Sequence, residues 1–528
     1  MVGGLYEGSR DYNELRERIA LDNILGVSAC RRQTFIILTD GCPHRSYRVC
    51  CCLLLGISWA RVEGVLNEGC GWRFRVNQRV NVMQRIKNAL KKCLPEGAKR
   101  FIQRVLGRTE LPQVKLQRKL TAAMVFLERG AIGRGVALLD RAFHNGLPAD
   151  RGLPADYIRE FLCAVEKRRS FDVASNEKSR ALTKQTRRLS VTCLPSIRWI
   201  SLYHVSVRNG LFMTGGAARE KAIESAYHEA ACSSADTECL VRAFKAGIDQ
   251  GDFGTASEML DRLNARSPEC EQIDDLWFYY FLNTGDTEQV RALGTRELTP
   301  EDRCFLEYIA GKSVAIVGPA PSNYDVGAEI DSFDIVARFN YRGVLPESVS
   351  FGRELDISYY NGETAGMISE TDDHGFFGDL DFAMFKFLAH PFQIPLLKAR
   401  RARLLRQNTF LFNGHPVAVP NALFDILHFQ PGRVKVFHAN FWLAHGSYYA
   451  GYAMSKRKKE MVGGSTDKFL GDDWRVTFSE HDFLSQVNFV RNLWRAGLVE
   501  ADDSCKEVLS LTSDGYLSAM EDIYTRSA

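Results

Sequence analysis

The sequence predicts an α/β fold with a largely parallel sheet in the C-terminal part of the chain, preceded by an all-α helical-repeat region. Two observations lead to this prediction. After Lys312, short apolar runs recur every 20–28 residues with helix-length segments between them, which is typical of buried strands alternating with helices. Before Lys312, apolar residues follow the helical period, and Gly-containing turns at Gly251 and Gly285 lie 34 residues apart.

Composition is that of an ordinary globular protein. Of the 528 residues, 45% are apolar and 25% charged, and the length suggests about three domains. The 68 Lys and Arg against 64 Asp and Glu leave a net charge of +4, which gives no reason to expect a nucleic-acid partner. The 14 cysteines contain no Cys-x-x-Cys pair, so we expect reduced thiols and neither disulfides nor a zinc site.

The first 119 residues divide into two segments. Residues 1–82 are a poorly patterned N-terminal extension, or precede a true start at Met83. Their longest uncharged apolar run, of 12 residues, is shorter than the ~20 of a membrane helix, and we expect neither an anchor nor a signal peptide. Residues 83–119 are a basic amphipathic segment with 11 Lys or Arg and two acids. It suits peripheral membrane contact or a solvated helical face.

Residues 120–310 are expected to form helical hairpins. The segments 128–142 and 249–263 share five residue types in register, including the glycines Gly130 and Gly251. A glycine there stops a helix in the left-handed conformation and lets the next helix pack back on it. The 34-residue period resembles a tetratricopeptide-like array, which would offer a surface for a protein partner.

Residues 311–528 carry the strand pattern. We expect the chemistry at the carboxyl ends of these strands. The expected strands are the apolar runs 314–317, 335–339, 355–359, 382–388, 410–412 and 434–437. The stretch from Asp482 to about Tyr524 is expected to return to helix.

The first two strands carry the sharpest local pattern. "SVAIVGPAPSN" runs from a strand into a turn at Gly318, without the Gly-rich patterns of dinucleotide or P-loop sites. Asn340 stands where a dinucleotide fold has an acid. Arg338 and Asn340 would emerge beside Gly318 and suit a phosphate and a pyrimidine or sugar. The alternative is a surface Arg338 paired with Asp331, Asp334 or Glu329.

These segments resemble the L-motif of the sialyltransferases, glycosyltransferase family 29. The matching residues, in order, are Gly318, Asp331, Asp334, Arg338, Asn340 and Gly352. Pro319 replaces the family's Asn, and Asn421-Ala422-Leu423 replaces the Ser-Thr-Gly of its S-motif. "HGSYYAGY" is similar to the third motif, and "SEHDFLSQ" to the very short motif, in which an acid follows the His by four residues. Here Gln486 follows His481 by five residues, so the acid is not reproduced. The resemblance covers about residues 311–525.

The resemblance implies a Rossmann-like, inverting, metal-independent glycosyltransferase that moves sialic acid or a related nonulosonate from a CMP-activated donor to a glycan or glycolipid acceptor. His481 would be the general base, since histidine titrates near neutral pH, and the acids beside it would orient its ring. His445 would stabilise the leaving phosphate. The implied nucleotide-sugar-binding residues are Gly318, Ser322, Asn323, Arg338, Asn340, Tyr448 and Tyr449.

Other interpretations stay open. The chain could be a helical-repeat adaptor with an inactive transferase domain, or a transferase using CMP-Kdo or a metal-bound UDP-sugar. Asp379-Leu380-Asp381 is a DxD sequence, but it precedes a strand on its amino side, so we expect a surface loop there and no metal or other cofactor. We expect a cytoplasmic enzyme, held peripherally at the inner membrane if the basic segment binds lipid.

Overall fold

The computed structural model describes most of the chain from Pro112 to Arg526, and the part from Pro112 to Ala528 forms one compact unit. The predictions for residues 1–82 and for the basic segment up to residue 111 lie outside the described residues. Single-residue gaps fall at 129, 146 and 297, and longer gaps at 149–150, 170–174, 267–272, 321–323, 362–363, 366–374, 387–401, 406–409 and 444–480.

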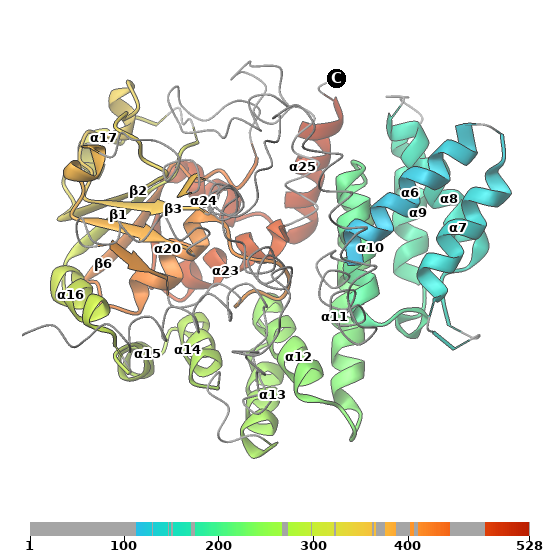
Figure 1. The fold of residues 1–528 in the computed structure, drawn as a ribbon, viewed down its shortest axis with the longest axis horizontal. Helices are drawn as coiled ribbons and strands as arrows, with labels where there is room; N and C mark the ends of the chain where they lie inside the picture. The colour runs from blue at the N-terminus through green and yellow to red at the C-terminus, as the bar shows by residue number, and fades with distance from the viewer. Residues whose placement is uncertain are drawn as a thin grey trace, which may run out of the picture. The chain divides into compact units, whose positions relative to one another are not determined.

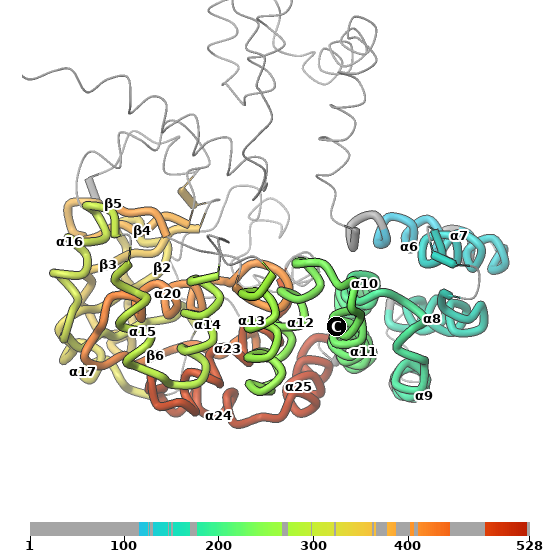
Figure 2. Tube along the Cα trace, turned by 90° about the horizontal axis from the view of Figure 1, so that it is seen from below, coloured from blue at the N-terminus to red at the C-terminus, as the bar shows by residue number. Residues whose placement is uncertain are grey.

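The first part of this unit is helical, as predicted, and its helices follow one another in a row beside the sheet (Figures 1 and 2). They are α6 (Pro112–Glu128), α7 (Ile132–His144), α8 (Ala155–Arg169), α9 (Ser175–Arg188), α10 (Ser196–Arg208), α11 (Phe212–Ala231), α12 (Thr237–Gln250), α13 (Phe253–Arg266), α14 (Ile273–Thr284), α15 (Thr287–Gly294) and α16 (Pro300–Ile309). Among the described residues, no helix is long and apolar enough to cross a membrane.

Glycines with left-handed backbone conformation join the predicted hairpins. Gly130, Gly251 and Gly285 have φ values of 71°, 72° and 79°, and they separate α6 from α7, α12 from α13 and α14 from α15. Each pair packs helix against helix. The prediction of helical hairpins with glycine stops is therefore confirmed, while their kinship to tetratricopeptide repeats stays a prediction.

A seven-stranded sheet follows, and all of its neighbouring strands are parallel. Its order is β5-β4-β3-β2-β1-β6-β7, so the chain builds outward from β1 in one direction and then returns to add β6 and β7 on the other side. The strands are β1 (Ser313–Val317), β2 (Ile335–Phe339), β3 (Ile357–Tyr360), β4 (Phe382–Phe385), β5 (Ala402–Leu404), β6 (Arg433–Phe437) and β7 (Glu500–Ala501).

Five of the six predicted strands are present, and one is wrong. The run 410–412 is not a strand, because its phenylalanines pack as aromatic rings in the core: Phe410 stacks on Phe424, with ring centroids 4.1 Å apart. The fifth strand lies earlier, around Arg403, in a segment too basic to look like a buried strand. Arg403 is nevertheless buried, because it forms ion pairs with Asp302 and Asp425.

Helices cover both faces of the sheet. Side chains such as Val314 and Ile316 of β1 join the large core that includes the helical array, α20 (Ala418–Leu427) and α23 (Phe483–Arg495). Ala315 and Val317 face the opposite way, into a smaller core with α17 (Gly327–Ile330) and η3 (Val349–Phe351). The last helices, α24 (Asp503–Leu509) and α25 (Ser513–Arg526), complete the predicted return to helix.

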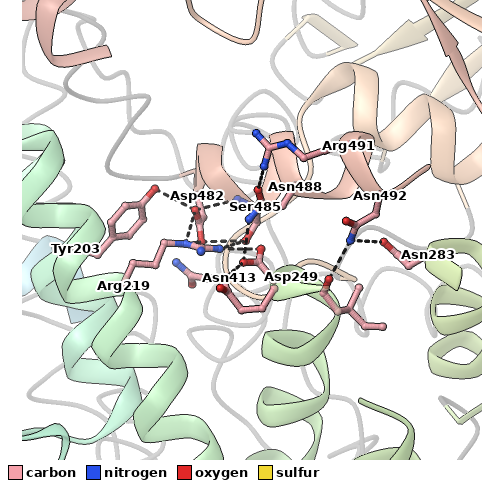
Figure 3. Close-up of polar contacts among 12 residues, drawn as sticks. Tyr203, Arg219, Asp249, Asn283, Asn413, Asp482, Ser485, Asn488, Arg491 and Asn492 are labelled. Atoms are coloured by element: carbon pink, nitrogen blue, oxygen red, sulfur yellow. Dashed lines mark hydrogen bonds and ion pairs between the residues drawn. The ribbon is translucent and has the colours of Figure 1, made fainter. Parts of the chain in front are cut away.

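A buried polar network joins the array to the α/β part (Figure 3). Arg219 on α11 donates to both carboxylate oxygens of Asp482, to Asp249 on α12 at 2.8 Å and to Ser485 at 2.7 Å. Tyr203 donates to Asp482 as well. The boundary predicted at residues 310/311 therefore separates two kinds of secondary structure inside one compact unit with a continuous core.

Candidate functional site

The strand order marks one edge of the sheet as the candidate site. The chain reverses its direction of growth at β1, whose neighbours are β2 on one side and β6 on the other. In open parallel sheets, ligands bind outside the carboxyl ends of the strands at such a reversal. The helices α20 and α23 lead directly into β6 and β7, so each begins at this same edge.

Most strands of the sheet end in a polar residue at this edge. Asn340 follows β2, and its Oδ1 accepts a hydrogen bond from the main-chain N–H of Asn361, which follows β3 and is exposed. Lys386 follows β4, and His438 follows β6. Gly318 follows β1. Polar residues thus follow four of the strands at the same edge at which Gly318 follows β1.

The backbone is strained at the two strand ends that flank β1. Asn340 has a φ of 54° and His438 a φ of 53°, values that non-glycine residues rarely adopt. Phe441 and Trp442, shortly after β6, also have positive φ values. Because such conformations persist only where the surroundings impose them and cluster at functional sites, they support the location of the site.

Gly318 packs against main chain. A Cβ at this position would clash with the carbonyl oxygen of His438, and Gly318 N–H donates to Phe437 O at 2.8 Å. We predicted that the absence of a side chain at Gly318 makes space for a ligand. In the structure that space is filled by the main chain at the end of β6. A ligand at this point would meet the turn that follows, of which residues 321–323 lie outside the described part.

His438 is held tightly and has one unsatisfied nitrogen. Its Nε2 donates to Ser350 O at 2.8 Å, which places the proton there and makes Nδ1 an acceptor. Nδ1 is buried and has no hydrogen-bond partner among the described residues, and burial lowers the pKa of the imidazole. The ring stacks on Phe351 with centroids 4.2 Å apart. His438 is thus a neutral histidine at the reversal point of the sheet.

The L-motif-like residues hold the loop before β3. Asp331 accepts hydrogen bonds from the main-chain N–H groups of Arg353 and Glu354. Arg338 is 3% exposed and donates to the main-chain oxygens of Phe351 and Glu354. Arg338 therefore holds main chain on both sides of Gly352. We expect it to position the edge of the site.

His481 lies just before α23 and contacts the loop that leads into α20. It forms an isolated antiparallel bridge with Gly414, and its Nδ1 donates to His415 O at 3.2 Å. A carbonyl only accepts, so the neutral ring carries its proton on Nδ1, and Nε2 is its basic nitrogen. The neighbouring Asp482 turns inward to Arg219, and the other acid beside the ring, Glu480, lies outside the described residues.

Gln486 and Lys386 hold the same loop. The Gln486 amide accepts from Val417 N–H at 2.9 Å and donates to His415 O at 3.1 Å. A glutamate could accept the first bond but not donate the second, so glutamine suits this position. Lys386 Nζ donates to Pro416 O at 2.7 Å, and burial lowers the pKa of its ammonium to about 8.

The structure places predicted residues at two points of this edge. Gly318 and Asn340 follow the adjacent strands β1 and β2, and His481 lies just before α23. Ser322, Asn323, His445, Tyr448 and Tyr449 lie outside the described residues. Asn421 lies in the first turns of α20 and is buried, and its Oδ1 has no hydrogen-bond partner in the part of the chain that the structure describes.

Sequence analysis missed Asn361, Lys386 and His438. Asn361 and His438 are polar residues just after an apolar run, which is the signal that could have found them. Lys386 was hidden because the predicted run extended to residue 388.

The described part of the chain contains no group of three or more His, Cys, Asp or Glu side chains placed to hold a metal ion. Asp379 accepts a hydrogen bond from Tyr341, and Asp381 accepts one from Tyr308. Both acids precede β4 at the amino edge of the sheet, as expected for a surface loop.

Comparison with protein-family models gave no match, and comparison with curated proteins gave no significant match.

Proposed function

We propose that this protein is a glycosyltransferase that transfers sialic acid or a related nonulosonate from a CMP-activated donor to a glycan acceptor, without a metal ion and with inversion. The observation that carries the proposal is the setting of His481. Its Nδ1 donates to His415 O, so the lone pair of the neutral ring is on Nε2, and the ring lies at the carboxyl edge of a parallel sheet.

The dimensions of this edge suit a nucleotide sugar. β2 and β3 separate β1 from β4, so the strand ends at Gly318 and Lys386 lie three strand spacings apart, roughly 14 Å. A nucleoside monophosphate joined to a nine-carbon sugar is long enough to span that interval. The nucleotide would lie near the reversal point at Gly318 and His438, and the sugar near His481.

The proposed reaction needs one base. The acceptor hydroxyl gives its proton to His481 Nε2 while its oxygen attacks the anomeric carbon from the face opposite the phosphate. The bond between that carbon and the phosphate oxygen breaks, and CMP leaves with the electron pair. A base positioned in this way typically contributes 10²- to 10⁴-fold to the rate.

The first experiment measures CMP release from CMP-sialic acid in EDTA by the full chain, with an oligosaccharide acceptor, beside His481→Ala. We expect release by the wild-type protein and a loss of about 10²- to 10⁴-fold in the variant. His228→Ala, an exposed histidine on α11, is the matched control and should be unaffected.

Three outcomes would count against the proposal. Unchanged release in His481→Ala would remove this residue as the base. Release from a UDP-sugar that EDTA abolishes, or from CMP-Kdo alone, would assign a different donor. Absence of turnover with all three donors, together with a protein captured on the helical array, would favour the adaptor.

A further inference from the structure

Lys386 is a cation in an unusual setting. It directly follows β4, is half-buried, and donates to the main-chain oxygen of Pro416. In the described part of the chain its ammonium forms no ion pair, which leaves its other N–H groups available to a ligand. Its pKa of about 8 keeps most of it charged at neutral pH.

Two buried arginines of this unit are neutralised by acids, whereas the buried Arg491 donates to Leu509 O and to Asn488 and forms no ion pair among the described residues. Arg403 lies between Asp302 and Asp425, and Arg219 lies between Asp249 and Asp482. Taking a charge out of water without a counter-charge costs free energy. Among the described residues no acid offsets the desolvation of the Lys386 ammonium, and Lys386 lies at the edge of the sheet where ligands are expected.

Lys386 and His481 share one loop. Lys386 contacts the carbonyl of Pro416, and His481 contacts the carbonyl of the preceding residue, His415. The two side chains are thereby fixed on neighbouring peptide groups. The loop leads into the N-terminus of α20, which has no side-chain cap among the described residues, and a helix N-terminus favours negative charge.

We infer that Lys386 binds the carboxylate of the transferred sugar. The inference rests on the proposed function. In a nonulosonate the carboxylate is bonded directly to the anomeric carbon, so it lies beside the carbon that the acceptor oxygen attacks. A group that binds this carboxylate must therefore lie close to the base, as Lys386 lies close to His481.

The test compares two ligands that differ in the sugar. Dissociation constants of CMP and of CMP-sialic acid are measured by calorimetry for the full-length wild type, Lys386→Met, Lys386→Arg and Lys312→Met. Lys312 is a half-buried lysine at the amino edge of the sheet, over the Tyr308 ring, and serves as the matched control.

We expect Lys386→Met to weaken CMP-sialic acid about 10- to 100-fold, the range of one charge-assisted hydrogen bond, and to leave CMP unchanged. Lys386→Arg should restore most of the affinity, and Lys312→Met should resemble the wild type. Equal weakening of both ligands in Lys386→Met would overturn the inference, because it would mean that Lys386 only supports the loop. Unchanged binding of CMP-sialic acid would overturn it too.

Failure of the proposed function would look different. In that case the wild type itself would bind neither CMP nor CMP-sialic acid. If the wild type binds CMP-sialic acid more tightly than CMP and Lys386→Met does not lose that difference, the proposed function stands and only the role of Lys386 falls.

Discussion

At the scale of single residues, Gly318 was correctly predicted to follow a strand, but the reason for a glycine at this position is different from the predicted one. The sequence marks it as a glycine after a strand, which suggests space for a ligand. In the structure that space holds the carbonyl of His438, the residue that ends the adjacent strand β6. Gly318 therefore determines how closely β1 and β6 approach at the reversal point of the sheet.

We expect Gly318→Ala to destabilise the protein by about 1–3 kcal/mol, because the added methyl group has to displace main chain. Thermal and urea denaturation measure this loss. Gly133→Ala is the control: Gly133 lies in α7 with open space around it, and alanine there should be neutral or stabilising by up to about 1 kcal/mol. Equal stability of the two variants would contradict this expectation and would mean that the main chain at His438 moves aside at little cost in free energy.

The same distinction applies to the charged residues of the L-motif-like segment. Their identity and order can be read from the sequence, but their partners cannot. Asp331 and Arg338 bind main-chain atoms of residues 351–354. Main-chain partners leave no signature in the residue types, so sequence analysis offered only a ligand or a surface acid for Arg338.

At the scale of elements, α23 depends on a charge supplied by the helical array. Asp482 caps this helix through Ser485 N–H and is paired with Arg219 on α11. Both side chains are almost fully buried. Removing one partner of such a pair leaves the other charged, buried and unpaired.

We therefore expect Arg219→Met to lower the free energy of unfolding by about 3–5 kcal/mol, since it strands Asp249 and Asp482 in the core. Chemical denaturation of the variant measures the change. Arg433→Met removes an exposed ion pair with Glu500 and should cost less than about 1 kcal/mol. If both variants lowered the free energy of unfolding by the same small amount, the prediction would be wrong, because the carboxylates of Asp249 and Asp482 would then have to be solvated by water.

The elements themselves were largely predictable. Period and length located the helical hairpins and five strands, because each has an amphipathic or apolar pattern of its own. β5 was missed because Arg403 is neutralised by acids 101 and 22 residues away. The contact between Arg219 and Asp482 spans 263 residues and has no local signature either.

At the scale of the whole molecule, the sheet and the array are parts of one folding unit. Residues of α12 and α14 share the core with α20 and α23, and the buried polar network crosses the same interface (Figure 3). The sequence predicts two domains here because the period changes at Lys312. A change in the spacing of apolar residues indicates a change from helices to strands. It does not indicate where a domain ends, because that depends on which apolar faces pack together in the fold.

A fragment of residues 311–528 should therefore fail to fold, since the apolar face that the array covers would be exposed. A fragment of residues 112–528 should unfold in one cooperative transition. Circular dichroism with a dye for exposed apolar surface checks both. A stable, dye-negative 311–528 fragment would restore the two-domain description.

The network in Figure 3 also has a consequence in time. During synthesis, Arg219 and Asp249 leave the ribosome long before Asp482, which is 233 residues further along than Asp249. At about 5–20 residues per second, that interval is roughly 10–50 s. For this period the helical array lacks the partner that completes its buried network, and for part of it β1 lacks its neighbour β6. We therefore expect nascent chains to expose apolar surface of the array during that interval, which is the condition under which partly folded chains aggregate.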